Sequence, residues 1–316
     1  MGSMDLSQKR ILLTGGSGFL GQHVLDYLQV LGVDPAQVRI PRSASHDLRQ
    51  WSVCQEVVQD QDIVIHLAAH VGGIGLNQAK PAELFYDNLI MGAQLIHAAH
   101  QAGVEKFVCV GTICAYPKFT PVPFQEDELW NGYPEETNAP YGVAKKALLV
   151  QLQSYRQQYG FNGIYVLPVN LYGPLDNFDL FSSHVIPALI RKVHEAQLQG
   201  QPYLEVWGDG TPTREFFFSE DCARGIVIAT QFYDGDQPVN LGTGEEISIK
   251  DLVELISELM DFQGEIRWQT DKPNGQPRRC LDVSRAKETC GFEAKVSLRE
   301  GLERTIAWYR QHAASN

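Results

Sequence analysis

The sequence predicts an α/β protein built on a doubly wound parallel sheet, with a second and smaller α/β lobe. In the first half, short apolar runs rich in Val and Ile alternate with stretches of helical length, which indicates parallel strands covered by helices on both faces. A glycine-rich segment separates the first run from the first helix, as is typical of such sheets. After Gly173 the chain becomes rich in turn-forming residues, which indicates a second lobe.

The individual elements follow from the same patterns. The main sheet is predicted from short apolar runs at residues 10–14, 37–40, 62–69, 106–111, 163–168 and 238–242, the last of which returns late in the chain. Helices are predicted at residues 22–32, 188–197, 219–232, 248–260 and 297–312. Ser248 precedes an amphipathic stretch and is a candidate N-cap.

The two lobes are expected to share the chain without a clean linker, since no repeat, low-complexity stretch or long charge run is present. The first domain is predicted at 5–174 plus 215–242, and the second at 175–214 plus 243–316. The second lobe is therefore expected to be discontinuous, because its segments leave and rejoin the first.

The composition of the 316 residues, 44% hydrophobic and 20% charged, is that of an ordinary globular protein. A formal net charge of −12 argues against nucleic acid and anionic membranes as partners. No apolar run is long enough to span a bilayer and no signal peptide is recognisable, so we expect a cytoplasmic protein without a membrane partner. The six cysteines are scattered without a CxxC pair, which favours reduced thiols and no metal site.

The segment LLTGGSGFLG places Gly15, Gly18 and Gly21 at three-residue spacing between a strand and a helix. The first glycine permits the tight turn, the second lets a pyrophosphate approach the backbone, and the third lets the helix pack on the strand. Free N–H groups at the helix N-terminus can bind phosphates. The alternative is a glycine-rich turn without a ligand, but the order of strand, loop and helix favours a dinucleotide.

The region after the second strand, VRIPRSASHDL, indicates which dinucleotide is bound. An acidic residue there would bond the ribose 2′-hydroxyl of NAD. Arg39 and Arg42 are present instead, and no acid precedes Asp47, so a guanidinium group can bind a 2′-phosphate. We predict NADP(H) as the cofactor; the alternative is that both arginines are solvated surface charges.

Tyr141 and Lys145 are spaced i, i+4, which places both on one face of a helix. A nearby ammonium group stabilises a tyrosine phenolate, so such a pair can exchange a proton with an alcohol or ketone while a nicotinamide exchanges hydride. Thr112 adds a hydroxyl where the strand at 106–111 ends, and Cys114 adds a thiol two residues later.

Together, TGGSGFLG, Thr112, YGVAK and NLYGP resemble the extended short-chain dehydrogenases/reductases, which act mostly on nucleotide sugars. The resemblance implies a Rossmann-type, NADP-binding first domain and a second domain that binds a nucleotide sugar. It also implies that the Thr112 hydroxyl bonds the reacting oxygen. The implied cofactor contacts are Gly15, Ser17, Gly18, Phe19, Leu20, Gly21, Arg42, Asp47, Leu48, Ala68, Ala69, Tyr141, Lys145, Pro168, Asn170, Leu171 and His184.

More specific stretches, among them HLAAHVGGIGLN, TICAYPK, SHVIPALIRK and GTPTREF, resemble the GDP-L-fucose synthase family over nearly the whole chain. This resemblance implies NADPH-dependent 3,5-epimerisation and 4-reduction of GDP-4-keto-6-deoxy-D-mannose. It implies Cys114 as the base, His184 as the acid and Tyr141 as the proton donor to O4. The implied substrate contacts are Asn170, Lys192, Trp207, Arg214 and Asn274. A homodimer through helices at about 84–101 and 141–159 is also implied.

Three positions depart from that family's pattern, since Thr112, Lys192 and Asn274 replace a serine usual in bacterial members, an arginine and an aspartate. These changes bear on affinity more than on chemistry. One alternative is a related nucleotide-sugar epimerase, dehydratase or simple 4-keto reductase, against which Cys114 and His184 argue because they suit α-proton exchange. Another is a redox-sensing binding protein, against which the intact Thr112 and Tyr141 argue.

Overall fold

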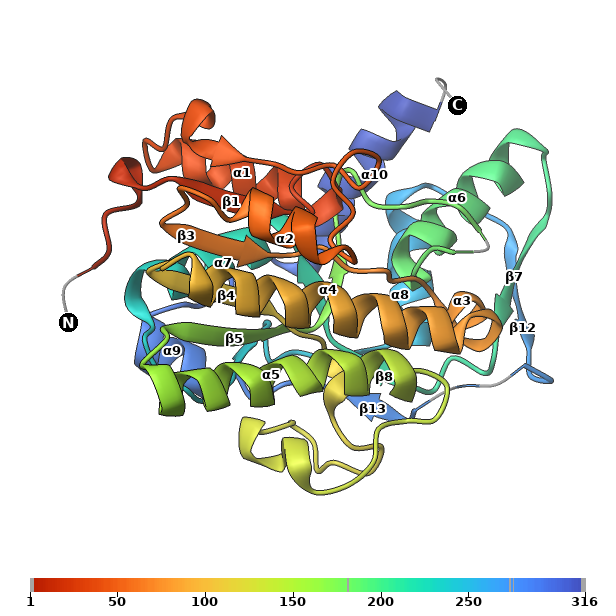
Figure 1. Cartoon of the computed structure of the whole chain (residues 1–316). Helices are drawn as coiled ribbons and strands as arrows, with labels where there is room; N and C mark the ends of the chain where they lie inside the picture. Colours follow the sequence, from red (N-terminus) through yellow and green to blue (C-terminus); the bar gives the residue numbers. More distant parts are fainter. Residues whose placement is uncertain (1–2, 181, 273, 275, 314–316) are drawn as a thin grey trace.

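The computed structural model describes residues 3–180, 182–272, 274 and 276–313. Its centre is a six-stranded sheet with the order β10-β5-β4-β3-β1-β2 (Figure 1), and every pair of neighbouring strands is parallel. Its strands are β1 (Ile11–Thr14), β2 (Val38–Arg39), β3 (Ile63–His66), β4 (Lys106–Val110), β5 (Gly163–Pro168) and β10 (Val239–Leu241). The predicted fold class is confirmed, including the late return of the chain as β10.

Helices cover both faces of this sheet, as expected for a doubly wound fold. In Figure 1, α4 and α5 run side by side in front of the strands, with α1 and α7 on the other face. These helices, with α2 packed on α4 and α9 packed on α7, are α1 (Phe19–Val30), α2 (Trp51–Val57), α4 (Pro81–Gln101), α5 (Ala139–Tyr159), α7 (Ser219–Phe232) and α9 (Ser284–Cys290).

The strand order places a topological switch point at the carboxyl ends of β1 and β3. The chain passes from β1 outward to β2, then crosses back to β3 on the other side of β1. The loops after β1 and β3 therefore leave the sheet in opposite directions, which is where open α/β sheets bind ligands.

The second lobe combines short sheets with three helices. Its paired strands are β6 (Asn170–Tyr172) with β9 (Phe216–Phe218), β7 (Tyr203–Trp207) with β12 (Glu265–Gln269), and β8 (Thr213–Arg214) between β11 (Ile247–Ser248) and β13 (Arg278–Arg279). Its helices are α6 (Val185–Leu198), α8 (Ile249–Leu259) and α10 (Leu298–His312). Ser248 caps α8 as predicted, since its hydroxyl accepts a 3.0 Å hydrogen bond from the Asp251 N–H.

Short elements complete the chain. They are the helix α3 (Ile74–Ala79) and the 3-10 turns η1 (Leu6–Gln8), η2 (Pro35–Gln37), η3 (Ile113–Ala115) and η4 (Glu126–Trp130). Of the helices in the described part of the chain, none combines the length and apolarity that crossing a bilayer requires.

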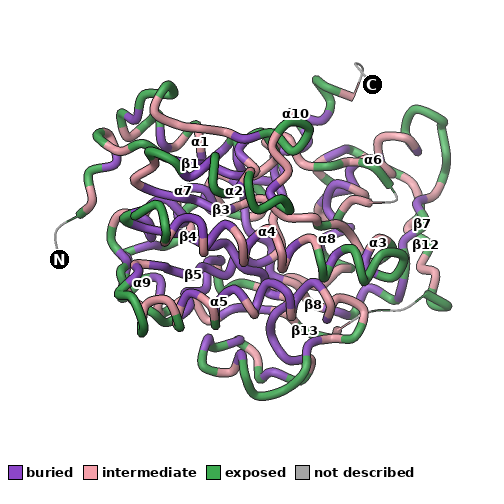
Figure 2. The backbone as a smooth tube through the Cα atoms, viewed as in Figure 1, coloured by how far each residue is buried: buried purple, intermediate pink, exposed green. Residues whose placement is uncertain are grey.

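Two separate hydrophobic cores correspond to the two lobes, and Figure 2 shows the buried backbone concentrated around the central sheet. The predicted ranges do not divide these cores cleanly. Tyr172 and Phe218, from the first predicted domain, pack in the second core. Leu281 and Phe292, from the second predicted domain, pack in the first core. Residues 314–316, the end of the second predicted domain, lie outside the described residues.

Candidate active site

The loop between β1 and α1 forms a cradle that fits a dinucleotide pyrophosphate. Gly15 has φ +72°, and a Cβ on it would lie 2.9 Å from the Ala68 backbone nitrogen, so this turn requires glycine. A Cβ on Gly21 would lie 2.2 Å from the Gly15 carbonyl oxygen. Helix α1 begins at Phe19 with Gly18 as an N-cap that makes no side-chain bond, which leaves its first N–H groups for a ligand. The other predicted contacts in this turn are Ser17 and Leu20.

The region after β2 distinguishes between the two arginines considered for the 2′-phosphate. Arg39 is engaged with α2, because its guanidinium bonds the Glu56 carboxylate at 3.1 Å and the Glu56 carbonyl at 3.0 Å. Arg42 is exposed, and no described residue bonds its side chain. The Asp47 carboxylate is paired with Arg49 at 2.9 Å. Arg42 is therefore the available guanidinium at this edge.

The remaining predicted cofactor contacts lie near the carboxyl ends of strands or on the segment after β2, and they are Leu48, Ala68, Ala69, Pro168, Asn170 and Leu171. The Asn170 amide donates a 2.9 Å hydrogen bond to the Glu215 carbonyl, which joins β6 to β9. The Glu215 carboxylate is fully buried and accepts backbone N–H groups from Gly244 at 3.0 Å and Leu281 at 2.7 Å. This buried acid anchors the crossing between the lobes.

The Thr112 hydroxyl and the Cys114 thiol lie on one tight turn beyond β4. Thr112 caps η3, since its hydroxyl accepts a 3.2 Å hydrogen bond from the Cys114 N–H. Helix α5 packs directly on this turn, because a Cβ on Gly142 would lie 2.2 Å from the Cys114 carbonyl oxygen. Tyr141 precedes that glycine, is 8% exposed and hydrogen-bonds the Thr112 side chain. The structure therefore brings Thr112, Cys114 and Tyr141 together.

Burial determines the protonation of the Tyr141–Lys145 pair. Desolvation raises the pKa of Tyr141 far above its usual range; the neighbouring Cys114 acts in the same direction, and the bond to Thr112 opposes it. Lys145 is 2% exposed, and burial lowers its pKa. The Tyr165 hydroxyl donates a 2.9 Å hydrogen bond to the Lys145 carbonyl and fixes this part of α5. Tyr141 keeps its proton at neutral pH, as a proton donor requires.

His184 belongs to the second lobe and follows the segment that contacts the loop after β3. It is the N-cap residue of α6, and it is exposed. The protein atoms around it lower its imidazole pKa by desolvation. The Gly73 N–H donates a 3.1 Å hydrogen bond to the Ser182 carbonyl, so the segment before His184 contacts the loop after β3.

One carboxyl group in the segment before His184 is incompletely hydrogen-bonded. Asp176 Oδ1 accepts a 2.7 Å hydrogen bond from the Asn177 N–H, whereas its Oδ2 is buried without a partner among the described residues. Burial raises the pKa of Asp176 to about 7.

Asp176→Asn is expected to stabilise the protein more at pH 8 than at pH 5. A carboxyl group whose pKa is raised on folding stabilises the folded state below its unfolded pKa of about 4, and this contribution is lost as the pH rises through about 7. Asparagine does not titrate, so the free energy of unfolding of the variant relative to wild type should increase by on the order of 2 kcal/mol between these pH values. Urea unfolding of both proteins measures this difference, and a difference independent of pH would contradict it.

Arg214 offers a positive charge without a carboxylate partner. Its guanidinium donates to the carbonyls of Thr213 at 2.7 Å and Pro277 at 3.4 Å, and no described acid pairs with it. Burial lowers the pKa of Arg214 to about 10, and the positive charge of Arg279 contributes less in the same direction. Arg279 is the register partner of Arg214 on β13. A partly buried cation held by carbonyls alone suits an anionic group such as a diphosphate.

The other predicted substrate contacts surround β7. Trp207 ends this strand with 62% of its surface exposed, which leaves its ring available for a ligand. Asn274 Oδ1 accepts a 3.0 Å hydrogen bond from the Asp209 N–H and so holds the turn after Trp207. Lys192 Nζ donates a 3.2 Å hydrogen bond to the Glu205 carbonyl, and burial lowers its pKa. Asn274 and Lys192 thus also support the protein's own backbone.

The backbone contacts that assemble this site were missed in the sequence. Gly142 lets α5 approach Cys114, and its only signal was the glycine of YGVAK. Gly73 contacts the segment before His184, and its signal was the glycine pair of HVGG. Such pairs mark close backbone approach but do not indicate the partner.

The chain resembles known proteins over most of its length. The model of the NAD dependent epimerase/dehydratase family matches residues 11–242. A GDP-L-fucose synthase of Sinorhizobium fredii is 40% identical over 313 residues, which cover 98% of each chain. The chain belongs to the GDP-L-fucose synthase family, within this larger family.

Solved structures resemble this member of the GDP-L-fucose synthase family over nearly its whole length. A GDP-6-OMe-4-keto-L-xylo-heptose reductase from C. jejuni is 27% identical with a TM-score of 0.91, covering 98% of this chain and 100% of the other. A GDP-L-fucose synthetase from Naegleria fowleri bound to NADP is 25% identical with a TM-score of 0.89, covering 99% and 98%. These similarities agree with the cradle described above.

For a chain of the GDP-L-fucose synthase family, the structure separates the predicted residues into two groups. Thr112, Cys114 and Tyr141 meet at η3. His184 and Arg214 are placed by the second lobe, and among the described residues no side-chain hydrogen bond joins them to that trio.

Proposed function

We propose that this protein converts GDP-4-keto-6-deoxy-D-mannose into GDP-L-fucose by inverting C3 and C5 and reducing C4 with NADPH. The observation that carries the proposal is the meeting of the Thr112 hydroxyl, the Cys114 thiol and the Tyr141 phenol where η3 and α5 touch. The 40% identity to the Sinorhizobium fredii GDP-L-fucose synthase supports this substrate.

In the proposed inversion, the Cys114 thiolate removes a proton from the carbon next to the ketone, and the C–H electrons form an enolate. The hydroxyls of Thr112 and Tyr141 donate hydrogen bonds to the enolate oxygen, as an oxyanion hole does. The His184 imidazolium then gives a proton to the opposite face of the same carbon. One ketone thus serves both epimerisations, which explains why a thiol and a hydroxyl share one turn.

In the proposed reduction, Tyr141 donates its proton to O4 once the ketone is in place. Bound NADPH supplies the hydride. The high pKa of the buried Tyr141 phenol suits this role, and Lys145 on the same helix face stabilises the phenolate that remains. The residues that would hold the cofactor are the cradle from Gly15 to Gly21 and Arg42, which can bind a 2′-phosphate.

The proposed GDP site uses the second lobe. The Arg214 guanidinium can form two parallel hydrogen bonds to the diphosphate, and the exposed Trp207 ring can contact the base. Asn274 lies beside this site and holds the turn after Trp207 through its bond to the Asp209 N–H. Lys192 and Asn170 complete the proposed substrate contacts.

We also propose a cytoplasmic homodimer formed through α4 and α5. These helices lie side by side, and their N-terminal parts border an apolar hollow of about 400 Å³. This hollow is lined by Pro81, Ala82, Phe85, Tyr133, Pro140 and Val143. All six cysteines are free, which agrees with a reducing compartment.

The experiment that tests the function is turnover of GDP-4-keto-6-deoxymannose with NADPH in deuterated water, followed by NMR. GDP-L-fucose with deuterium at C3 and C5 is the expected product. A product reduced at C4 without deuterium would mean a simple reductase, and the roles proposed for Cys114 and His184 would be wrong.

A further inference from the structure

The segment before His184 rests on a glycine of the loop after β3. The Gly73 N–H donates a 3.1 Å hydrogen bond to the Ser182 carbonyl. A Cβ on Gly73 would lie 2.8 Å from the Ser183 carbonyl oxygen, closer than real Cβ atoms come. Gly73 has φ −64° and ψ −178°, which any residue adopts, so close approach rather than backbone conformation requires the glycine.

A buried side chain holds this glycine in place. Asn77 of α3 is 9% exposed, and its amide nitrogen donates to the carbonyls of Gly72 at 2.8 Å and Gly73 at 3.0 Å. The Asn77 N–H also donates to the Gly73 carbonyl at 3.2 Å. These hydrogen bonds from Asn77, which we call the clamp, fix the orientation of the peptide units on either side of Gly73.

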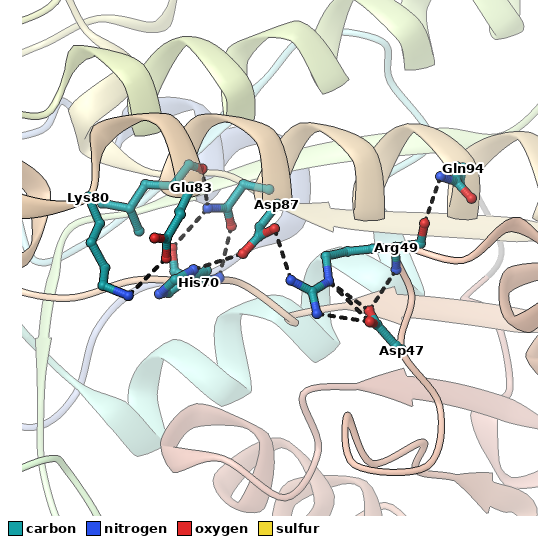
Figure 3. A network of polar contacts seen from close by, with 9 residues as sticks. Asp47, Arg49, His70, Lys80, Glu83, Asp87 and Gln94 are labelled. Atoms are coloured by element: carbon teal, nitrogen blue, oxygen red, sulfur yellow. Dashed lines mark hydrogen bonds and ion pairs between the residues drawn. The ribbon is translucent and has the colours of Figure 1, made fainter.

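The beginning of the same loop is fixed to α4. Asn88 accepts the His70 N–H at 3.0 Å and donates to the His70 carbonyl at 2.8 Å, and the His70 ring bonds Asp87 at 3.0 Å. Figure 3 shows Asp87 between His70 and Arg49, which in turn pairs with Asp47. The loop is therefore held at both of its ends before it meets the second lobe.

The segment it contacts is held from its other side as well. Asp179 Oδ1 accepts both the N–H and the hydroxyl of Ser182, at 3.0 and 2.8 Å, and Asn177 donates to that hydroxyl at 2.9 Å. Two residues later, His184 is the N-cap of α6. The position of the His184 backbone thus depends on the contacts that hold Ser182 and Ser183 in place.

We propose that Gly73, clamped by Asn77, is a positioning residue that sets where His184 delivers its proton during inversion. This inference rests on the proposed function, because it takes His184 as the acid. Reduction at C4 takes its hydride from NADPH and its proton from Tyr141 on α5, which this loop does not hold. A displacement at Gly73 should therefore impair inversion selectively and leave C4 reduction competent.

Gly73→Ala tests this with one added methyl group, which must push on the Ser183 carbonyl. The readout is the ratio of GDP-L-fucose to GDP-6-deoxyhexose reduced at C4 without inversion, measured by NMR in deuterated water. The ratio is expected to fall by about ten- to a hundred-fold, the loss that follows small misplacements of reacting groups. The thermal unfolding midpoint of the variant, measured beside the ratio, shows whether it still folds.

Gly72→Ala is the matched control, because the three atoms nearest to its added Cβ all belong to the Leu76 side chain. It should keep the wild-type product ratio. Asn77→Ala provides a second route, since it removes the clamp without adding atoms, and it should shift the ratio in the same direction as Gly73→Ala. Equal loss of both products in the Gly73 and Asn77 variants would overturn the inference. Failure of the wild-type protein to incorporate deuterium would instead overturn the proposed function.

Discussion

Tyr141→Phe is expected to reduce the rate of C4 reduction by about 10²- to 10⁴-fold while leaving slow solvent exchange at C3 and C5. The substitution removes the hydroxyl that is the proposed donor to O4, together with its bond to Thr112, and keeps the ring on the buried helix face. Exchange survives because Cys114 is untouched and the Thr112 hydroxyl still donates to the enolate oxygen. In the wild-type protein, burial holds the Tyr141 phenol protonated at neutral pH, and phenylalanine has no proton to give in its place.

The measurement combines NADPH consumption, followed by absorbance, with deuterium content of the recovered sugar. Tyr203→Phe is a suitable control, because Tyr203 lies on β7 and its ring packs under the Arg267 guanidinium, 4.0 Å away. Wild-type reduction by Tyr141→Phe would mean that another group protonates O4.

The main sheet was predictable because its strands carry their own signal. β3 and β4 are short and fully buried, so every position is selected for packing on two faces. The glycine-rich turn before α1 and the Ser248 cap of α8 are likewise local, since each depends on neighbours within a few residues. The return of the chain at β10 followed from an apolar run after a helix.

Long-range contacts were not predictable, because they depend on which surfaces meet after folding. Charge alone allows both Arg39 and Arg42 to bind a 2′-phosphate, and only the fold shows that, of these two, it is Arg39 that bonds Glu56 on α2. The contact between Gly73 and Ser182 joins residues more than a hundred positions apart through backbone atoms, which carry no side-chain signal. The chemistry of the site was therefore more visible in the sequence than its scaffolding.

Sharing of residues between the cores has the same origin. β6 and β9 pair with each other at the boundary between the lobes, so Phe216 and Phe218 pack in the second core while Phe217 packs in the first. Alternation of side chains along one strand directs neighbours to opposite faces. A boundary drawn along the chain cannot divide such a strand.

Cys114→Ser is expected to abolish formation of GDP-L-fucose while leaving NADPH binding intact. Serine is nearly isosteric, and the bond that fixes this turn runs from the backbone N–H of residue 114 to Thr112, so the turn should persist. A hydroxyl is a far poorer base than a thiolate near neutral pH, so the α-protons remain in place.

The same variant separates the two proposed proton-transfer roles at this site. In deuterated water Cys114→Ser should incorporate no deuterium at C3 or C5, whereas Tyr141→Phe should still incorporate it. Cys114→Ser can still reduce the uninverted ketone, because Tyr141 and the cofactor cradle are unchanged. GDP-L-fucose formed at the wild-type rate by Cys114→Ser would assign the base to another residue. The shared turn at η3 would then serve only to hold Thr112 against Tyr141.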